Sequence, residues 1–370
     1  MSERRVTLAD VARLAGVSPT TASFVLSGRG PEMRISRDVE QRVLKIADEV
    51  QYRPNIVSVG LRTGTTRTIG FVSDTVATSR FAGDLIKGAL EAARERGVML
   101  SIGETEGDVQ LERLLVQAML DRQVDGIILA SMYTRALTVP SVLTSAPAVL
   151  LNALPKSRSA LPAVLPDEAD AGRAAARVLL EAGHREGIHL IGAGPDVGDI
   201  PTGGVAAAER LTGIHEVLGQ ANVSVSSGTL CHAWEPETGQ AATRALIDRE
   251  RPRALICLND RLALGAYHAL HDASLEVPTD VSVVSFDDDP IASWIRPGLT
   301  TVALPHYALG RKAVEVLLAE IDLPEPAARR AAVHRVPMPL RERESVAPPA
   351  GHQRSNGEAR SNGRRNGGGS

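Results

Sequence analysis

From residue 68 onward, short β-type runs alternate with longer helical stretches, and the same plan occurs twice. The first set covers 68–73, 84–96, 98–103, 111–121, 126–130 and 148–152, and the second covers 171–182, 187–192, 206–219, 239–248, 254–258, 261–273, 281–287 and 307–320. Alternation of strands and helices predicts parallel sheets joined by right-handed crossovers. Two sets of similar length therefore predict two doubly wound subdomains that face each other across a cleft.

The length of the chain is consistent with more than one compact unit. It has 370 residues, whereas single hydrophobic cores stop growing near about 250–300 residues. We expect an α/β body over residues 67–345, in which the chain crosses between the subdomains near residues 165, 304 and 335. Ligands of open parallel sheets bind outside the carboxyl ends of the strands, so a site is expected in the loops that follow the strands.

The first fifty residues follow a different pattern, which predicts three short helices. Thr7 is a suitable N-cap for the first helix, and Gly16 is suited to end it. Ser18 is a suitable N-cap for the second, with Pro19 at the first helical position, where its missing N–H costs nothing. Two short helices joined by a glycine turn form the helix-turn-helix layout. We therefore expect a separate all-α domain over residues 1–52.

Two segments have compositions that do not favour a stable fold of their own. The stretch 53–66 has room for only a short helix, which is marginal in water because helix nucleation is costly, and Gly60 weakens it further. We interpret it as a hinge that orders only when docked. Residues 346–370 are rich in Pro, Gly, Ser, Asn and Arg and carry no apolar heptad. We predict a disordered tail there, without a C-terminal coiled coil.

The charge of the chain is divided unevenly. Residues 1–67 contain eleven Lys and Arg against seven Asp and Glu, which gives a net charge of +4. Because the whole chain has a net charge of −3, residues 68–370 have a net charge of −7. A basic head on an acidic body suits a protein that presents one end to a polyanion and keeps the other end away from it.

Several classes of protein are disfavoured by what the sequence lacks. It has no apolar run of the ~18 residues that span a bilayer and no apolar stretch of a signal peptide near its start, so we expect a cytoplasmic protein. Cys231 and Cys257 are not in a paired metal spacing, and the histidines show none either. Neither a G-x-S-x-G elbow nor a P-loop is present. We expect neither an enzyme nor a bound metal or cofactor.

Polar and aromatic side chains follow several predicted strands, where a ligand of the cleft would lie. Aromatic residues make up only 3% of the chain, so the position of two of them near strand ends is informative. An aromatic face packs against a sugar ring or a nucleobase, and carboxylates and amides pair with vicinal hydroxyls. The predicted effector-binding residues are Asp74, Phe81, Asn152, Arg210, Trp234, Asn259 and Asp287.

Each predicted aspartate has a structural alternative. A carboxylate at the end of a strand is often a solvated loop residue or a helix cap, which is the interpretation we favour for Asp288 and Asp289. Convergence of Arg210, Asn259 and Asp287 on one cleft favours a binding role for those three. Asp167 and Glu168, at an expected crossing between the subdomains, are further candidates.

Six strings occur in a fixed order along the chain: VTLADVARLAGVSPTTASFVLSG, YRPN, TIGFVSD, LICLNDRLALGA, VSVVSFDD and PGLTTV. Together they resemble the lactose/galactose-repressor family of bacterial transcription regulators, over residues 4 to about 345. The resemblance implies a fold of the periplasmic-binding-protein type behind a DNA-binding head, working as a homodimer on a palindromic operator in double-stranded DNA. The second helix of each head would enter the major groove, and the paired hinge helices would enter the minor groove.

The resemblance also assigns roles in DNA binding to individual positions. The predicted DNA-binding residues are Pro19, Thr20 and Phe24 at bases, Thr7, Thr21, Ser23 and Asn55 towards phosphate or backbone, Leu61 as a wedge between base pairs, and Ser18 at the start of the second helix. Short hydroxyls reach phosphates or base edges, and an aromatic ring contacts a thymine methyl. Packing of Phe24 into the three-helix core, and ordinary capping by the hydroxyls, are the alternatives.

The sequence departs from the family pattern in two places. Pro19 and Phe24 stand where many relatives carry polar or basic side chains that contact bases, so methyl contacts and DNA shape would carry more of the specificity. Residues 57–60 replace the usual Ala, Arg and Gln of the hinge, which weakens the expectation of a helix there.

The function implied is sequence-specific repression of genes for carbohydrate uptake or catabolism, controlled by a small sugar or nucleoside. In relatives, the positions that match Asp74, Arg210, Trp234, Asn259 and Asp287 contact the effector. Two alternatives stay open from the sequence. One is a ligand-binding protein of the same fold whose head no longer binds DNA, and the other is activation of transcription instead of repression.

Overall fold

The computed structural model describes residues 6–53, 64–79, 83–159, 161–323 and 331–349. The chain divides into two compact parts, of which one contains the three N-terminal helices and the other contains both β-sheets. Most of the predicted hinge, residues 54–63, lies outside the described residues. At its end, the backbone N–H of Thr66 and the hydroxyl of Thr65 donate hydrogen bonds to the Asp125 carboxylate, at 2.7 and 2.9 Å.

The N-terminal part is a three-helix domain, as the sequence predicts. Its helices are α1 (Leu8–Ala15), α2 (Pro19–Leu26) and α3 (Arg37–Glu49). Thr7 and Asp10 form a reciprocal capping box at the start of α1, and Gly16 ends the helix in the left-handed conformation at φ 66°. The small core of this domain is built from Val11, Ala12, Ala15, Ala22, Val25, Val43 and Ala47.

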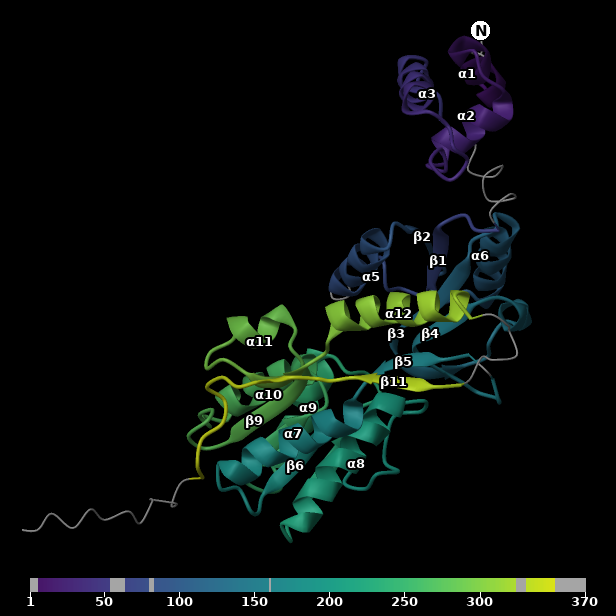
Figure 1. The fold of residues 1–370 in the computed structure, drawn as a ribbon. Helices are drawn as coiled ribbons and strands as arrows, with labels where there is room; N and C mark the ends of the chain where they lie inside the picture. Colours follow the sequence, from purple (N-terminus) through teal and green to yellow (C-terminus); the bar gives the residue numbers. More distant parts are fainter. Residues whose placement is uncertain (1–5, 54–63, 80–82, 160, 324–330, 350–370) are drawn as a thin grey trace, which may run out of the picture. The chain divides into compact units, whose positions relative to one another are not determined.

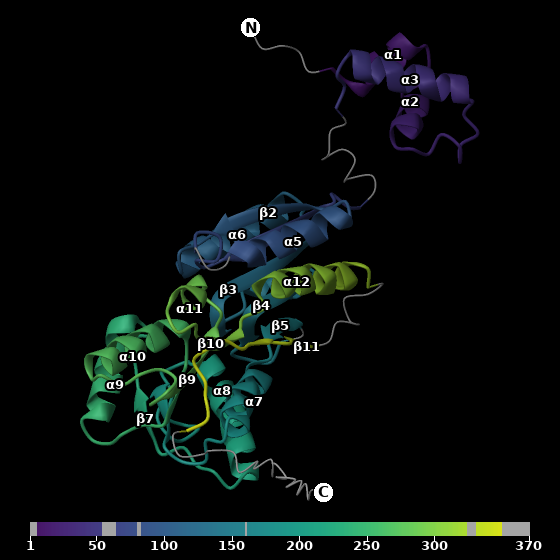
Figure 2. The same ribbon diagram turned by 90° about the vertical axis from the view of Figure 1, so that its left-hand side faces the viewer.

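The second part consists of two lobes, each built on a six-stranded sheet (Figure 1). The first lobe contains β1 (Thr68–Ser73), β2 (Met99–Glu104), β3 (Gly126–Leu137), β4 (Ala148–Pro155), β5 (Ala163–Pro166) and β11 (Val333–Val336), in the order β11-β5-β4-β3-β1-β2. Its helices are α5 (Gly83–Glu95), α6 (Val109–Asp121) and α12 (His306–Ile321). Figure 2 shows α12 beside α5 on this lobe. The β1–β3, β3–β4, β4–β5 and β5–β11 pairs are parallel, as expected.

The second lobe repeats the plan with one difference. Its strands are β6 (Ile188–Gly192), β7 (Ser227–Leu230), β8 (Ala254–Cys257), β9 (Ser282–Asp287), β10 (Thr300–Ala303) and β12 (Leu340–Arg341), in the order β12-β10-β9-β8-β6-β7. Its helices are α7 (Glu168–Glu181), α8 (Val205–Gln220), α9 (Pro236–Ile247), α10 (Asp260–Asp272) and α11 (Pro290–Trp294). The edge strand β12 runs antiparallel to β10. This edge differs from the parallel pairing predicted for the sheets, because the last strand enters the lobe without a crossover helix.

The chain passes between the lobes three times. It leaves the first lobe after β5 and enters α7, returns from β10 to α12, and leaves again from β11 to β12. These passages lie at residues 166–168, 303–306 and 336–340. Because both lobes are assembled from separate stretches of the chain, the crossings hold the two lobes together covalently at one side.

The C-terminal boundary of the second lobe lies later than the predicted start of the tail at residue 346. The backbone N–H of Ala347 donates to the Ser282 hydroxyl at 3.1 Å, and the Ala347 carbonyl lies 3.0 Å from the buried ring of His184. Val346 packs against the core of the lobe. The composition of the tail did not predict that these residues belong to the lobe, because the hydrogen bonds of Ala347 are made by its backbone.

Helices α7 and α8 pack so closely that two glycines are required between them. A Cβ at Gly213 would overlap the carbonyl oxygen of Ala169, and a Cβ at Gly172 would overlap the carbonyl oxygen of Arg210. Both obstacles are backbone atoms on the neighbouring helix, so neither moves aside as a flexible side chain would. The spacing of α7 and α8 is therefore fixed by these two positions.

Replacing Gly213 with alanine is expected to lower the free energy of unfolding by about 1–3 kcal/mol, because the added methyl group overpacks this contact. Gly219 lies on the same helix with nothing within 4 Å of a Cβ, so Gly219→Ala is the matched control. It is expected to stabilise the helix slightly, since alanine favours helix more than glycine does. Urea unfolding followed by circular dichroism measures both, and equal midpoints for the two variants would contradict the close packing.

Candidate functional site

A buried ion-pair cluster lies at the carboxyl ends of the strands in the second lobe. Arg210, in α8, is 2% exposed. Its Nε donates to Glu168 Oε2 at 2.6 Å, and its Nη2 donates to Glu168 Oε1 and to Asp287 Oδ1, both at 3.3 Å. Its Nη1 donates to the backbone carbonyl of Leu258, the residue that follows β8. The guanidinium is thereby fixed in orientation between α7, β8 and β9.

Trp234 and Asn259 join this cluster through two kinds of contact. The Arg210 guanidinium carbon lies 6.0 Å from the centre of the Trp234 ring. The side chain of Asn259 caps α10 by accepting from the Leu262 N–H at 2.8 Å, and its Nδ2 donates to the Trp234 carbonyl at 3.2 Å. The indole Nε1 of Trp234 is buried and has no hydrogen-bond partner among the described residues. It is a free donor beside a fixed cation.

The acid groups of the cluster are electrostatically unusual. Burial raises the pKa of Asp287 to about 6, although Arg210 opposes the shift. Burial also raises the pKa of Asp260, the first residue of α10, to about 7, with the nearby Asp287 charge adding to the effect. Burial of Arg210 works against its charge, but Glu168 and Asp287 hold its pKa above the usual value. Two carboxylates, those of Glu168 and Asp287, thus share one guanidinium, which makes the region unfavourable for a further anion.

A second polar cluster follows the strands of the first lobe. Asp74, directly after β1, accepts from the N–H of Thr75 at 2.7 Å and of Met132 at 2.9 Å, and pairs with Arg135 at 3.0 Å. Asn152 donates to the Met132 carbonyl at 3.1 Å from β4, where its own backbone is left-handed at φ 57°. The single residue Met132 therefore links Asp74 and Asn152 through its N–H and its carbonyl.

The structure thus groups the predicted effector residues by lobe. Arg210, Trp234, Asn259 and Asp287 form one cluster in the second lobe, and Asp74 and Asn152 form another in the first. Phe81 lies outside the described residues. The structural interpretation holds for the two neighbours of Asp287, since Asp289 caps α11 and Asp288 pairs with Arg343 at 2.6 Å.

Three residues of the two polar clusters were not among the effector-binding residues predicted from the sequence. Glu168 was only a further candidate, yet it is 1% exposed and makes two contacts to Arg210. Arg135 lies in the second half of β3, beyond the predicted strand 126–130, where a register shift interrupts the pairing with β4. Asp260 sits next to a predicted residue, but only the fold brings the hydroxyls of Ser285 and Thr301 to its carboxylate.

The predicted DNA-binding residues that the structure describes lie at the start of α1 and along α2 of the N-terminal domain. Ser18, Pro19 and Thr20 are exposed, whereas Thr21, Ser23 and Phe24 are half-buried. Phe24 is not part of the three-helix core, and the Arg29 guanidinium lies 5.5 Å from its ring centre. The core-packing alternative for Phe24 is therefore not favoured.

The capping alternative applies to two of the hydroxyls. Thr7 caps α1, and the Ser18 oxygen accepts from the Thr21 N–H at 3.0 Å. Asn55 and Leu61 lie outside the described residues.

No helix of the described residues is long and apolar enough to cross a membrane. Within the same residues, no group of three His, Cys, Asp or Glu side chains is arranged to hold a metal ion.

Comparison with protein-family models gives two matches. Residues 7–55 match the model described as bacterial regulatory proteins of the lacI family, and residues 176–346 match a periplasmic binding protein-like domain. The first match covers the three helices, and the second covers most of the second lobe together with α12 and β11.

Similar proteins and structures extend over nearly the whole chain. The HTH-type transcriptional repressor PurR of Haemophilus influenzae (strain PittEE) is 32% identical over 320 residues, which is 85% of this chain and 91% of the relative. The lac repressor dimer bound to operator and the anti-inducer ONPF is similar with a TM-score of 0.75 and 25% identity, covering 93% of this chain and 100% of that one. A regulator from Enterococcus faecium with bound ribose has a TM-score of 0.59 and 25% identity, over 76% and 99%.

Proposed function

The chain belongs to the lacI family of bacterial regulatory proteins, and on that premise we propose that it represses carbohydrate uptake or catabolism genes under the control of a small sugar-like effector. It is a DNA-binding transcription regulator and not an enzyme. Because it acts on DNA, we place it in the cytoplasm. The head would bind the operator, and the two-lobed part would bind the effector.

The second-lobe cluster is the observation that carries the effector class. A sugar offers neighbouring hydroxyls, which donate to carboxylates and accept from a guanidinium or an indole N–H. Arg210, Asp287, Asn259 and Trp234 provide these groups within one set of contacts. The excess of carboxylates over cations favours an uncharged polyhydroxy ligand, such as a sugar or nucleoside, over a phosphorylated one.

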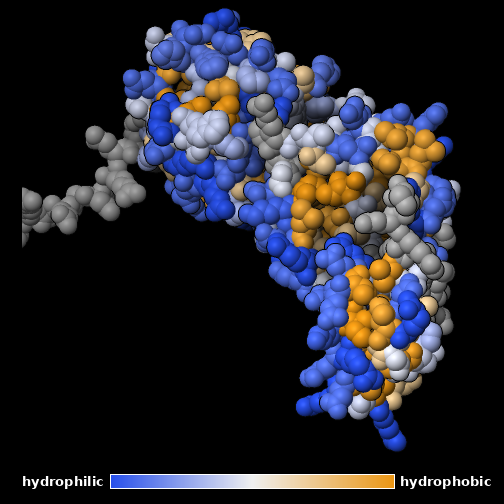
Figure 3. All heavy atoms as spheres, turned by 90° about the horizontal axis from the view of Figure 1, so that it is seen from above, coloured by the Kyte–Doolittle hydropathy of each residue, from blue (hydrophilic) through white to orange (hydrophobic). Residues whose placement is uncertain are grey.

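The first lobe supports assembly as a homodimer. Its edge strand β2 and the helices α5 and α6 expose large apolar side chains, namely Leu90, Met99, Ile102, Val109, Leu111 and Leu114. Figure 3 shows apolar groups gathered in patches on the surface, which on a soluble protein mark interaction sites. A second copy of the chain is the partner that would also bring two heads to one palindromic operator.

The experiment that tests the proposal selects genomic DNA fragments on the immobilised full chain and sequences them, with and without ribose. We expect one short palindrome to be enriched, and its binding to weaken steeply as salt rises, because phosphate contacts release counterions. Phe24→Ala should alter the base preference at symmetric positions, while Leu14→Ala, an exposed apolar residue of the same head, serves as the matched control.

The effector is tested separately by calorimetry with ribose, cellobiose, adenosine and ribose 5-phosphate. An uncharged ligand should bind and the phosphate should not, and Asp287→Asn should weaken the binding. No enriched sequence under any condition, together with normal sugar binding, would instead indicate a ligand-binding protein whose head no longer binds DNA. Binding of ribose 5-phosphate alone would contradict the proposed effector class.

A further inference from the structure

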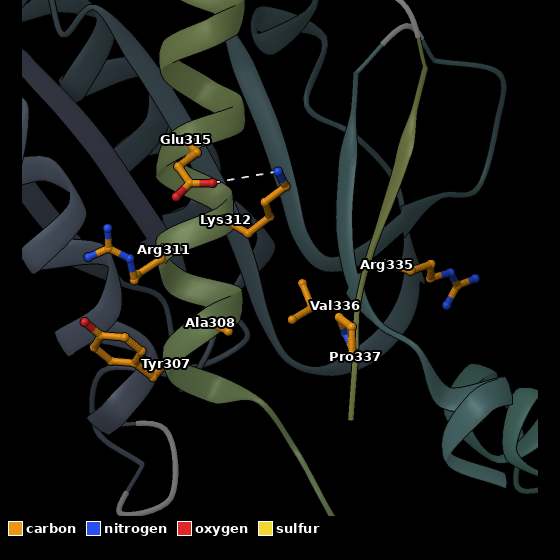
Figure 4. Close-up of a pocket in the computed structure, with 8 residues that line it drawn as sticks. All are labelled: Tyr307, Ala308, Arg311, Lys312, Glu315, Arg335, Val336 and Pro337. Carbon is orange, nitrogen blue, oxygen red and sulfur yellow. Dashed lines mark ion pairs between the residues drawn. The ribbon is translucent and has the colours of Figure 1, made fainter. Parts of the chain in front are cut away.

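One guanidinium joins the two lobes at the crossings. Arg335 lies on β11, in the sheet of the first lobe, and makes a two-point ion pair with Glu209, on α8 of the second lobe. The Arg335 Nη1 to Glu209 Oε2 distance is 2.6 Å, and the Nη2 to Oε1 distance is 2.7 Å. Arg335 and Val336 both line a pocket between α12 and β11, and in Figure 4 the guanidinium of Arg335 points away from α12, while Val336 points towards that helix.

The same guanidinium also contacts the first crossing. Arg335 Nη1 donates to the carbonyl of Pro166 at 3.1 Å, and Pro166 is the last residue of β5, immediately before the chain enters α7. Strands β5 and β11 pair in parallel, with Arg335 opposite Leu165 and Val336 opposite Pro166. Two of the three crossings and the start of α8 therefore meet at one side chain.

Glu209 is the immediate neighbour of Arg210, the central cation of the second-lobe cluster. Glu209 bonds to Arg335 in the first lobe, whereas Arg210 bonds to Glu168 and Asp287 in the second. The backbone between them is held by the glycine contacts of α7 and α8, which touch the Arg210 carbonyl itself. A shift of Glu209 relative to the first lobe would therefore be transmitted to Arg210.

The pair is better shielded than the exposed ion pairs of the same lobe. The side chains of Arg335 and Glu209 are 35% and 23% exposed, compared with 60% and 43% for Arg244 and Asp272. The hydrogen bonds that Arg335 donates to Glu209 are the main cause that raises the pKa of Arg335 above its usual value, and Asp167 and Glu168 add to the effect. A bidentate, partly desolvated pair fixes geometry as well as charge.

We propose that Glu209 and Arg335 are positioning residues, which set the orientation of Arg210 towards the first lobe and so determine effector affinity without touching the effector. The inference rests on the proposed function, because it concerns the same site. It extends the site to a pair that lies 126 residues apart in sequence and that joins the lobes.

The test uses Trp234 as a reporter. The chain contains two tryptophans, and Trp294 is 73% exposed, so the Trp294→Phe protein reports on Trp234 alone. In that background, Arg335→Ala and Glu209→Ala should each increase quenching of Trp234 fluorescence by acrylamide and weaken ribose binding by roughly 5–100-fold, the range of typical coupling between sites. Arg335→Lys should recover part of both effects, and Arg244→Ala is the matched control.

The double variant Arg335→Ala/Glu209→Ala distinguishes a pair from two independent structural effects. If the two residues act through each other, the double variant should be no worse than either single one. Additive effects, or quenching equal to that of the parent in all variants, would overturn the proposal. Should ribose fail to bind the parent protein, the quenching data still decide the positioning role, whereas the effector class of the proposed function would fail.

Discussion

Arg210→Ala is expected to lower the free energy of unfolding by about 3–5 kcal/mol, the largest loss expected from a single substitution in this chain. The variant leaves Glu168 buried without its cation, and it removes the partner of Asp287 as well. It also deletes the donor to the Leu258 carbonyl. Loss of the effector response should accompany the loss of stability, because the remaining groups of the cluster have no fixed centre.

The size of this effect is judged against an exposed pair. Arg244 pairs with Asp272 at 2.9 Å on the surface of the same lobe, and Arg244→Ala should cost no more than about 1 kcal/mol. Adding Glu168→Gln to Arg210→Ala should recover part of the loss, since it removes the unpaired buried charge. Urea unfolding at neutral pH measures all three variants. Equal losses for Arg210→Ala and Arg244→Ala would mean that burial of the cluster is unimportant.

Stability should fall as the pH rises from about 4 to about 7 through the contribution of Asp260. Its pKa is about 7 in the folded protein against an ordinary value of 3.8, so the folded state holds the proton more tightly across that window. The contribution is fully present below pH 4 and is lost as the pH passes the folded pKa. At about 1.4 kcal/mol for each pKa unit, the difference between 3.8 and about 7 amounts to about 4 kcal/mol. Asp287 acts in the same direction over a lower range.

Asp260→Asn should remove this part of the pH dependence. An asparagine oxygen accepts from the Asp289 N–H, as Oδ2 of Asp260 does at 2.7 Å, and its NH₂ group faces the hydroxyls of Ser285 and Thr301, which rotate to accept. The variant should therefore gain stability relative to the parent at pH 8 and differ little at pH 4. Thermal unfolding across pH gives the difference, with exposed Asp272→Asn as control. A constant difference at all pH values would contradict the assignment.

Local signals in the sequence were sufficient for the N-terminal domain and for most of the two lobes. Thr7 and Gly16 mark the two ends of α1, and Ser18 and Pro19 mark the start of α2, because capping groups and turns depend on neighbours in sequence. Strand and helix alternation likewise predicted both sheets. The short strands β5, β7, β10, β11 and β12 are absent from the predicted ranges, since two to four residues carry too little periodicity to stand out.

The candidate site was predictable only in part. Residues at the carboxyl ends of apolar strands, such as Asp74 directly after β1 and Asp287 as the last residue of β9, can be picked out in the sequence because parallel strands end at a common edge. Partners that meet through packing are not visible. Glu168 lies 42 residues from Arg210, and Arg335 lies on a strand that the sequence did not indicate. Their pairing depends on the close approach of α7 and α8 and on the order of strands in the first sheet.

The three crossings also have a consequence for biosynthesis. Helix α12 and strand β11 belong to the first lobe, but the ribosome makes them after nearly all of the second lobe. Until they emerge, the nascent first lobe lacks an edge strand and the helix whose Leu309, Ala313, Val314 and Leu317 fill its core. The DNA-binding head is translated first and has a core of its own. A nascent chain therefore carries a complete head for the whole period in which its sensor is unfinished.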